Sequence, residues 1–170
     1  NTGAVDIGQG SDTALAQMCA SALGLPLDRV AFAQPDTDAG VFNWGTAASR
    51  TTFTTGLAVV AASADAETQL KAHAADMMEC AAEDLDLRVG GKVGLKGVPD
   101  KELGFNEISA RAHWVTGGPI VGRYSFVFEG ERFDPKQAMV KGLALNGLGG
   151  WIFAAQIVEI EIDEATGRVM

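Results

Sequence analysis

The chain has 170 residues, the length of one domain, of which 47% are hydrophobic and 21% charged. Its 22 acidic and 13 basic residues give a formal net charge of −9, which disfavours nucleic acid or an anionic membrane surface as a partner, since both need a basic surface. The sequence shows no apolar run of about 18 residues and no signal-peptide pattern, so we predict neither a membrane span nor a secretory leader.

The first distinctive segment is the glycine-flanked loop Gly8-Gln9-Gly10, which leads into a helical pattern over residues 14–23 that ends at Gly24. Two glycines let the backbone approach a ligand, and the first turn of a helix offers unpaired N–H groups, so the loop is typical of an anion site. Ser11 is a candidate cap of that helix. Thr13 stands where a dinucleotide-binding motif needs its third glycine, and no P-loop lysine follows. An ordinary turn is the alternative interpretation.

Residues 29–34 are predicted as a strand, and residues 35–40 have the composition of a loop. From about residue 51 to residue 82 the pattern favours helix. It predicts either one long helix or two helices that break near residues 63–65.

A small hairpin is predicted for residues 85–89 and 92–95, with its turn at Gly90-Gly91. Residues 105–114 form the third helical pattern. Residues 117–150 are rich in glycine and predict loops and short strands. Cys19 and Cys80 fall in apolar helical patterns without metal-ligand spacing, and we expect buried thiols in a reducing, cytoplasmic compartment.

The end of the chain reads as a strand over residues 151–163, a turn over residues 164–167 and the start of a returning strand. Because the hairpin is incomplete and the distinctive loop comes so early, we expect the chain to be a piece of a longer protein. The strand edge would then be exposed, and we expect the isolated chain to self-associate through it. The elements together predict a single α+β domain over residues 1–170, with a mixed sheet and packed helices.

A second loop precedes the long helical pattern and contains six hydroxyl residues in the ten positions from Thr46 to Thr55. Small side chains at Ala47 and Ala48 would let backbone amides face a ligand, and Arg50 adds a positive charge with a planar fork of donors. A ligand with several phosphates or a polar bicyclic head would suit two such loops. The alternative is that Ser49 or Thr51 caps the helix and the other hydroxyls are solvated.

These segments occur in an order that resembles the molybdenum-cofactor-binding subunit of the xanthine dehydrogenase and aldehyde oxidase family. The resemblance covers most of the chain and is weaker between about residues 83 and 150. It rests on five blocks: residues 3–13 (GAVDIGQGSDT), 23–30 (LGLPLDRV), 36–38 (DTD), 46–50 (TAASR) and 154–169 (AAQIVEIEIDEATGRV).

The resemblance implies a molybdenum hydroxylase, an oxidoreductase that inserts a water-derived oxygen at a carbon of an aldehyde or N-heteroaromatic ring. The implied cofactor is molybdopterin, in bacterial members often as its cytosine dinucleotide. Iron–sulfur clusters and FAD would lie on partner domains or subunits, beside the remaining segments of the molybdenum subunit.

Carried over by position, the resemblance implies that two loops hold the cofactor and that no side chain ligates the metal. Gln9 would reach toward the metal or dithiolene, the Ala48 amide would lie near the metal, and the end of the second loop would contact the phosphate. The implied cofactor-binding residues are Gly8, Gln9, Gly10, Thr46, Ala47, Ala48, Ser49, Arg50 and Thr51.

The chain departs from the family pattern at the catalytic base, a glutamate in a Gly-x-Gly-Glu segment. The Gly130-Glu131 pair lacks that context and is interpreted as a surface turn, and His73 and His113 have no partner pattern. We therefore assign no catalytic residue and expect the isolated chain to be inactive. A free-standing nucleotide- or phosphate-binding module and a non-catalytic assembly domain remain as alternatives.

Overall fold

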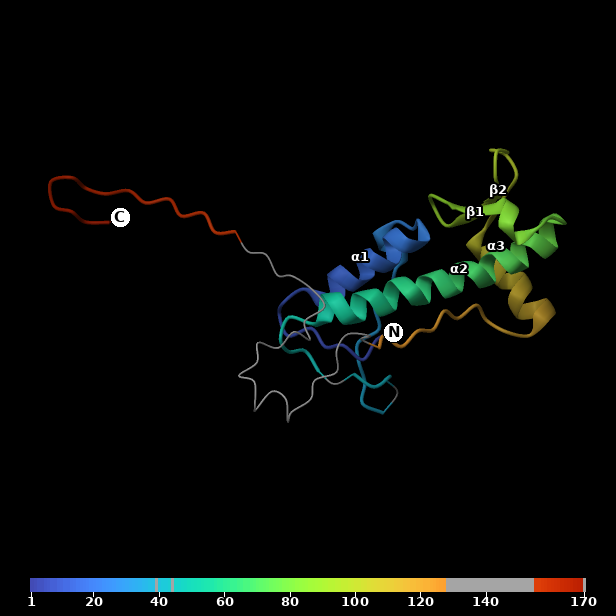
Figure 1. Ribbon diagram of the computed structural model, residues 1–170, viewed down its shortest axis with the longest axis horizontal. Coiled ribbons are helices and arrows are strands. Elements are labelled where there is room, and N and C mark those ends of the chain that lie inside the picture. Colours follow the sequence, from blue (N-terminus) through green and yellow to red (C-terminus); the bar gives the residue numbers. More distant parts are fainter. Residues whose placement is uncertain (39, 44, 128–154, 170) are drawn as a thin grey trace, which may run out of the picture. The chain divides into compact units, whose positions relative to one another are not determined.

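A computed structural model describes residues 1–38, 40–43, 45–127 and 155–169 of the chain (Figure 1). The chain divides into two units, Asn1–Val127 and Phe128–Met170. Every helix and strand among the described residues belongs to the first unit. In the described part of the chain, no helix has the length and apolar character needed to cross a membrane.

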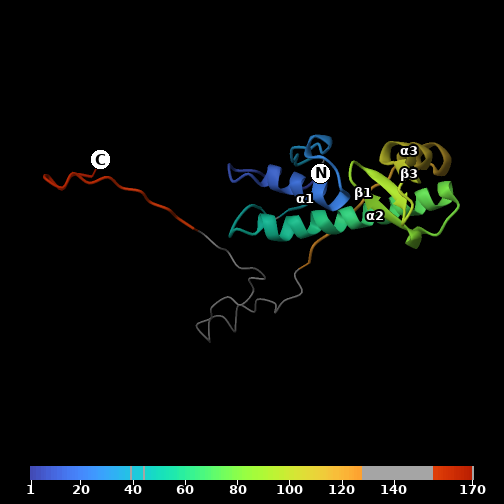
Figure 2. The ribbon, with the colours of Figure 1, turned by 90° about the horizontal axis from the view of Figure 1, so that it is seen from above.

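Two helices pack together along the first unit, α1 (Ser11–Leu23) and the longer α2 (Gly56–Met78). They begin at the same end in both Figure 1 and Figure 2. Gly56 permits their close approach, because a Cβ there would lie 2.6 Å from the sulfur of Met18. Gly24 ends α1 in the left-handed conformation, at φ 63°, as the sequence indicated.

The long helical pattern forms one α-helix without a break near residues 63–65. A five-residue π-helical turn, η2 (Thr51–Thr55), precedes it. Cys19 and Cys80 are free cysteines and are only partly buried, so the expectation of buried thiols holds in part.

The far end of α2 packs against a three-stranded antiparallel sheet and a short helix. The predicted hairpin is confirmed as β1 (Leu85–Arg88) and β2 (Lys92–Leu95), joined through the positive-φ residues Gly90 and Gly91. β3 (Glu102–Gly104) pairs with β2 and leads into α3 (Phe105–Arg111), which continues as the π-helical turn η4 (Ala112–Thr116).

Side chains from these elements form the hydrophobic core, which confirms the α+β class. The buried members of this cluster are Leu70, Ala74, Ala75, Met78, Leu85, Val93 and Ile108. Removing such side chains from water is the main force that holds α2, the sheet and α3 together.

The strand predicted for residues 29–34 is wrong. The structure has a 3-10 turn there, η1 (Leu27–Arg29), followed by irregular backbone. Alternating apolar residues form a strand only where a neighbouring strand pairs with their backbone groups. Among the described residues, no strand pairs with residues 30–34.

The terminal strand is also not formed where the structure describes it. Residues 155–161 are irregular, and the one described pairing is a bridge between Ile162 and Val169 around a turn at residues 164–166. Residues 151–154, the Gly130-Glu131 pair and most of the glycine-rich stretch lie outside the described residues. Residues 117–127 of that stretch contain no strand.

Candidate functional site

The exposed Gly8-Gln9-Gly10 loop closes around the carboxylate of Asp6. Oδ1 of Asp6 accepts hydrogen bonds from the amides of Gly8, at 2.8 Å, and Gly10, at 3.4 Å, and Oδ2 accepts one from the amide of Asp12 at 3.1 Å. These amides, Gly8 first and Asp12 second, hold the pKa of Asp6 below its ordinary value. The carboxylate of Asp6 therefore satisfies N–H groups at the start of α1.

Ser11 does not cap α1, contrary to the sequence-based expectation. Gly10 is the N-cap residue, at φ 78°, and as a glycine it has no side chain with which to cap the helix. Ser11 lies inside the first turn, is 2% exposed, and accepts a hydrogen bond from Nε2 of Gln9 at 2.9 Å. The cap position falls one residue earlier because glycine readily adopts a positive φ.

The side chain of Gln9 folds back into its own loop. Its Oε1 accepts a hydrogen bond from the amide of Ile7 at 2.7 Å, while its Nε2 donates to Ser11 and, at 3.4 Å, to the carbonyl of Val5. These bonds give the carboxamide a defined orientation on an exposed loop.

The second loop exposes Ala47, Ala48 and Ser49. Ala48 and Ser49 have φ angles of 51° and 54°, a left-handed conformation that costs a non-glycine residue on the order of 1–3 kcal/mol. The amide of Arg50 donates to the carbonyl of Ala47 at 3.2 Å and closes the turn. Two consecutive strained residues with small side chains are a recurrent feature of functional loops.

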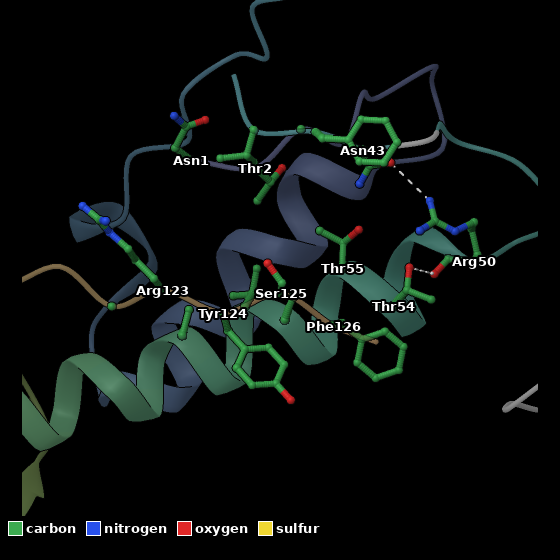
Figure 3. Close-up of a pocket in the computed structure, with 17 residues that line it drawn as sticks. Asn1, Thr2, Asn43, Arg50, Thr54, Thr55, Arg123, Tyr124, Ser125 and Phe126 are labelled. Atoms are coloured by element: carbon green, nitrogen blue, oxygen red, sulfur yellow. Dashed lines mark hydrogen bonds between the residues drawn. The ribbon is translucent and has the colours of Figure 1, made fainter. Parts of the chain in front are cut away.

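Arg50 supports this loop from within. Its Nη1 donates to the carbonyl of Gly45 at 2.7 Å and to Oδ1 of Asn43 at 3.2 Å, the latter drawn as a dashed line in Figure 3. The carbonyl of Arg50 accepts the amide and hydroxyl of Thr54. Arg50 is half-buried, and its hydrogen bonds connect the loop to η2.

The hydroxyl residues of the second loop differ in exposure. Ser49 is exposed and Thr46 half-buried, whereas Thr51 and Thr55 are 5% and 8% exposed. Neither η2 nor α2 has a side-chain cap, so the alternative interpretation, in which Ser49 or Thr51 caps the helix, is wrong.

The structure brings the two loops together. The hydroxyl of Thr46 donates a 2.7 Å hydrogen bond to the carbonyl of Val5, in the segment that leads into the first loop. Gly3 packs against Val41 and Asn43, where a Cβ would overlap the backbone. The two loops, which are far apart in sequence, therefore lie at the shared starting end of α1 and α2.

A cavity of about 750 Å³ opens beside the second loop (Figure 3). Of the expected site residues, Arg50 lines it. The other lining residues come from four segments: residues 1–3, residues 41–43, the end of η2 with the start of α2, and residues 122–126, which include Arg123, Tyr124 and Phe126.

Sequence reasoning missed the segment over residues 121–126, because it has no periodicity. It is held along α2: Val121 exchanges two backbone hydrogen bonds with the side chain of Gln69, at 3.0 and 3.2 Å, and the amide of Arg123 donates to Asp65 at 2.9 Å. The ring of Phe126 meets that of Phe53 edge to face at 5.8 Å. The one feature of this segment's sequence that indicated close packing is its glycine, Gly122.

No cluster of three or more potential metal-binding side chains occurs in the described part of the chain. His113 is exposed beside the ring of Trp114, and neither it nor His73 lines the cavity or either loop.

The family model described as a molybdopterin cofactor-binding domain matches residues 1–170. The carbon monoxide dehydrogenase large chain of Afipia carboxidovorans is 33% identical over 60% of this chain and 12% of its own length. A probable hypoxanthine oxidase of Escherichia coli strain K12 is 32% identical over 75% of this chain and 13% of its own length.

The crystal structure of a Cu,Mo-containing CO dehydrogenase superposes with a TM-score of 0.65 at 28% identity. The match covers 74% of this chain and 16% of that one. This chain thus spans a small part of the length of its relatives. Because the family model covers the whole chain, the chain belongs to the molybdopterin cofactor-binding domain family.

Proposed function

We propose that residues 1–170 belong to the cofactor-holding part of a molybdenum hydroxylase, in which both loops of the first unit contact molybdopterin. The observation that carries this proposal is the hydrogen bond from Thr46 to Val5, which joins the two loops at one end of the helix pair. In the proposal, the contacts come from Gly8, Gln9 and Gly10 and from the six residues Thr46, Ala47, Ala48, Ser49, Arg50 and Thr51.

The residues of the second loop fit a phosphate-bearing ligand by their exposure and backbone conformation. Ala48 and Ser49 lie in an exposed turn, a type of backbone that presents amide groups to anions. The hydroxyl of Ser49 adds a donor, while the guanidinium of Arg50 adds positive charge and holds the loop in shape.

A bound molybdenum centre would supply the chemistry that transfers a water-derived oxygen to a carbon of an aldehyde or an N-heteroaromatic ring. The chain's own loops bind and orient the cofactor. The base and the substrate pocket belong, in this proposal, to remaining segments of the molybdenum subunit, so the 170-residue chain alone is inactive.

We further infer the cytosine dinucleotide form of the cofactor, since the second loop combines Arg50 with the exposed Ser49 and the half-buried Thr46, a set of donors that suits a ligand with more than one phosphate. Iron–sulfur and FAD subunits would accept the electrons, and the complex would work in the cytoplasm. The relative named as a large chain of carbon monoxide dehydrogenase supports a multi-subunit assembly.

The proposal is tested by expressing the full-length protein together with iron–sulfur and FAD subunits and measuring bound metal and nucleotide. We expect about one molybdenum per chain and release of cytidine monophosphate on acid treatment. A bound nucleotide without molybdenum would favour a nucleotide-binding module. Absence of both would favour an assembly domain and contradict the proposal.

A further inference from the structure

Asp6 occupies the amide groups that a phosphate would use at the start of α1. A helix start binds anions through its unpaired N–H groups, and here the amides of Gly8, Gly10 and Asp12 already donate to the two oxygens of Asp6. The position that the sequence predicts for an external anion therefore holds an internal one.

A second anion at the same amides would meet an ionised carboxylate at contact distance. The helix dipole stabilises one negative charge at this end, but two like charges there repel each other, and both would compete for the same three donors. A phosphate could bind only if Asp6 left, which would break all three bonds and open the loop.

We propose that Asp6 is a positioning residue for the cofactor, an inference that rests on the proposed function of the first loop. Its carboxylate fixes the backbone from Gly8 to Asp12, and that backbone carries Gln9, whose carboxamide is held by Ile7 and Ser11. The first loop meets the cofactor through the side chain of Gln9 and not through backbone amides. Phosphate recognition belongs to the second loop.

The first test is a crystal structure of the cofactor-loaded, full-length protein. We expect Asp6 still to accept the amides of Gly8 and Asp12 within 3.5 Å, with no phosphate oxygen on the amides of Gly8, Gly10 or Asp12. A phosphate oxygen bonded to these amides, with Asp6 displaced, would overturn the inference and leave the proposed function intact.

The second test uses inorganic pyrophosphate and the full-length protein made in a host that does not synthesise the cofactor. Asp6→Ala frees the three amides, so its affinity for pyrophosphate should rise at least tenfold over wild type by calorimetry. In Asp6→Asn, which keeps one acceptor oxygen, the affinity for pyrophosphate should rise by a smaller factor. A residue that merely stabilised the fold would give a loss of binding, not a gain.

Asp12→Asn is the matched control, because it removes one negative charge from the first turn of α1, while the Asp12 side chain accepts from Gln34 and not from the loop amides. It should bind pyrophosphate as wild type does. Equal affinity of wild type and Asp6→Ala would contradict the inference. Since this arm needs no molybdenum, its outcome does not depend on whether the protein binds molybdopterin.

Discussion

At the scale of single residues, each loop is shaped by a charged side chain that is turned inward. Asp6 accepts the amides of the first loop, and Arg50 donates to the carbonyl of Gly45 in the second. The residues left exposed, Gln9 and Ala47 to Ser49, are uncharged. The charges therefore set the loop conformations, and the small or amide side chains are left on the exposed surface of the loops.

Asp6 should make the first loop sensitive to acid. The pKa of Asp6 in the folded protein is lowered, chiefly by the amide of Gly8. The stability that its ionised carboxylate adds to the loop is therefore fully present above the pKa of an unfolded chain, about 3.9, and is lost as the pH falls through the lower folded pKa. Hydrogen exchange of a peptide covering residues 7–12, corrected for intrinsic rates, should show protection that disappears below about pH 4.

In Asp6→Asn, protection of the same peptide should be weaker and should vary little over this pH range. Equal acid sensitivity in wild type and Asp6→Asn would show that another group controls the loop.

The sequence indicated the glycine loop but not the role of Asp6. Gly8 and Gly10 are recognisable because few other residues accept their positive φ angles of 101° and 78°. The bonds of Asp6 depend on how irregular backbone folds back over six residues, and no periodic pattern encodes that. Ser11 was chosen as the cap by residue type alone, and the structure buries it.

At the scale of elements, periodicity predicted what local spacing controls. α1, α2, α3 and the β1–β2 hairpin were all anticipated, since their apolar faces and turn glycines recur at fixed intervals. Residues 29–34 were misassigned because a strand depends on a partner elsewhere in the chain. The segment over residues 121–126 was missed for the related reason that side chains of α2, Gln69 and Asp65, hold it in place.

Gly122→Ala should release this segment from α2, because a Cβ there would overlap the carbonyl oxygen of Ala62. Such overpacking typically costs about 1–3 kcal/mol, which corresponds to about 5–150-fold faster tryptic cleavage after Arg123 if local opening controls cleavage.

Gly118→Ala is the control, since a Cβ at that position would meet nothing within 4 Å. Its cleavage rate should match wild type. Unchanged cleavage in Gly122→Ala would mean that the segment is not held by this contact.

At the scale of the whole molecule, the second unit carries an exposed apolar row on irregular backbone. Ile157, Val158 and Ile160 are 98%, 80% and 59% exposed. An exposed apolar segment outside any sheet favours pairing with another strand. We propose that in the full protein another segment covers this row, and that the isolated chain pairs with itself.

Ile160→Lys should therefore weaken self-association of the 170-residue chain about tenfold, roughly 1.4 kcal/mol, in analytical ultracentrifugation. Gln156→Lys adds the same charge at an exposed polar position of the same segment and should change it little. A wild-type chain that stays monomeric at high concentration would contradict the prediction.

The central claim, that the two joined loops hold molybdopterin, is tested most directly by the molybdenum content of the purified full-length Ala48→Glu protein. Ala48 is exposed and already left-handed, so the substitution adds bulk and negative charge to the loop surface with little change in backbone strain. Ala110→Glu, on the exposed face of α3, is the control. We predict that Ala48→Glu retains less than about a tenth of the wild-type molybdenum, a loss of roughly 1.4 kcal/mol or more, while Ala110→Glu retains all of it. Wild-type molybdenum content in Ala48→Glu would contradict the account.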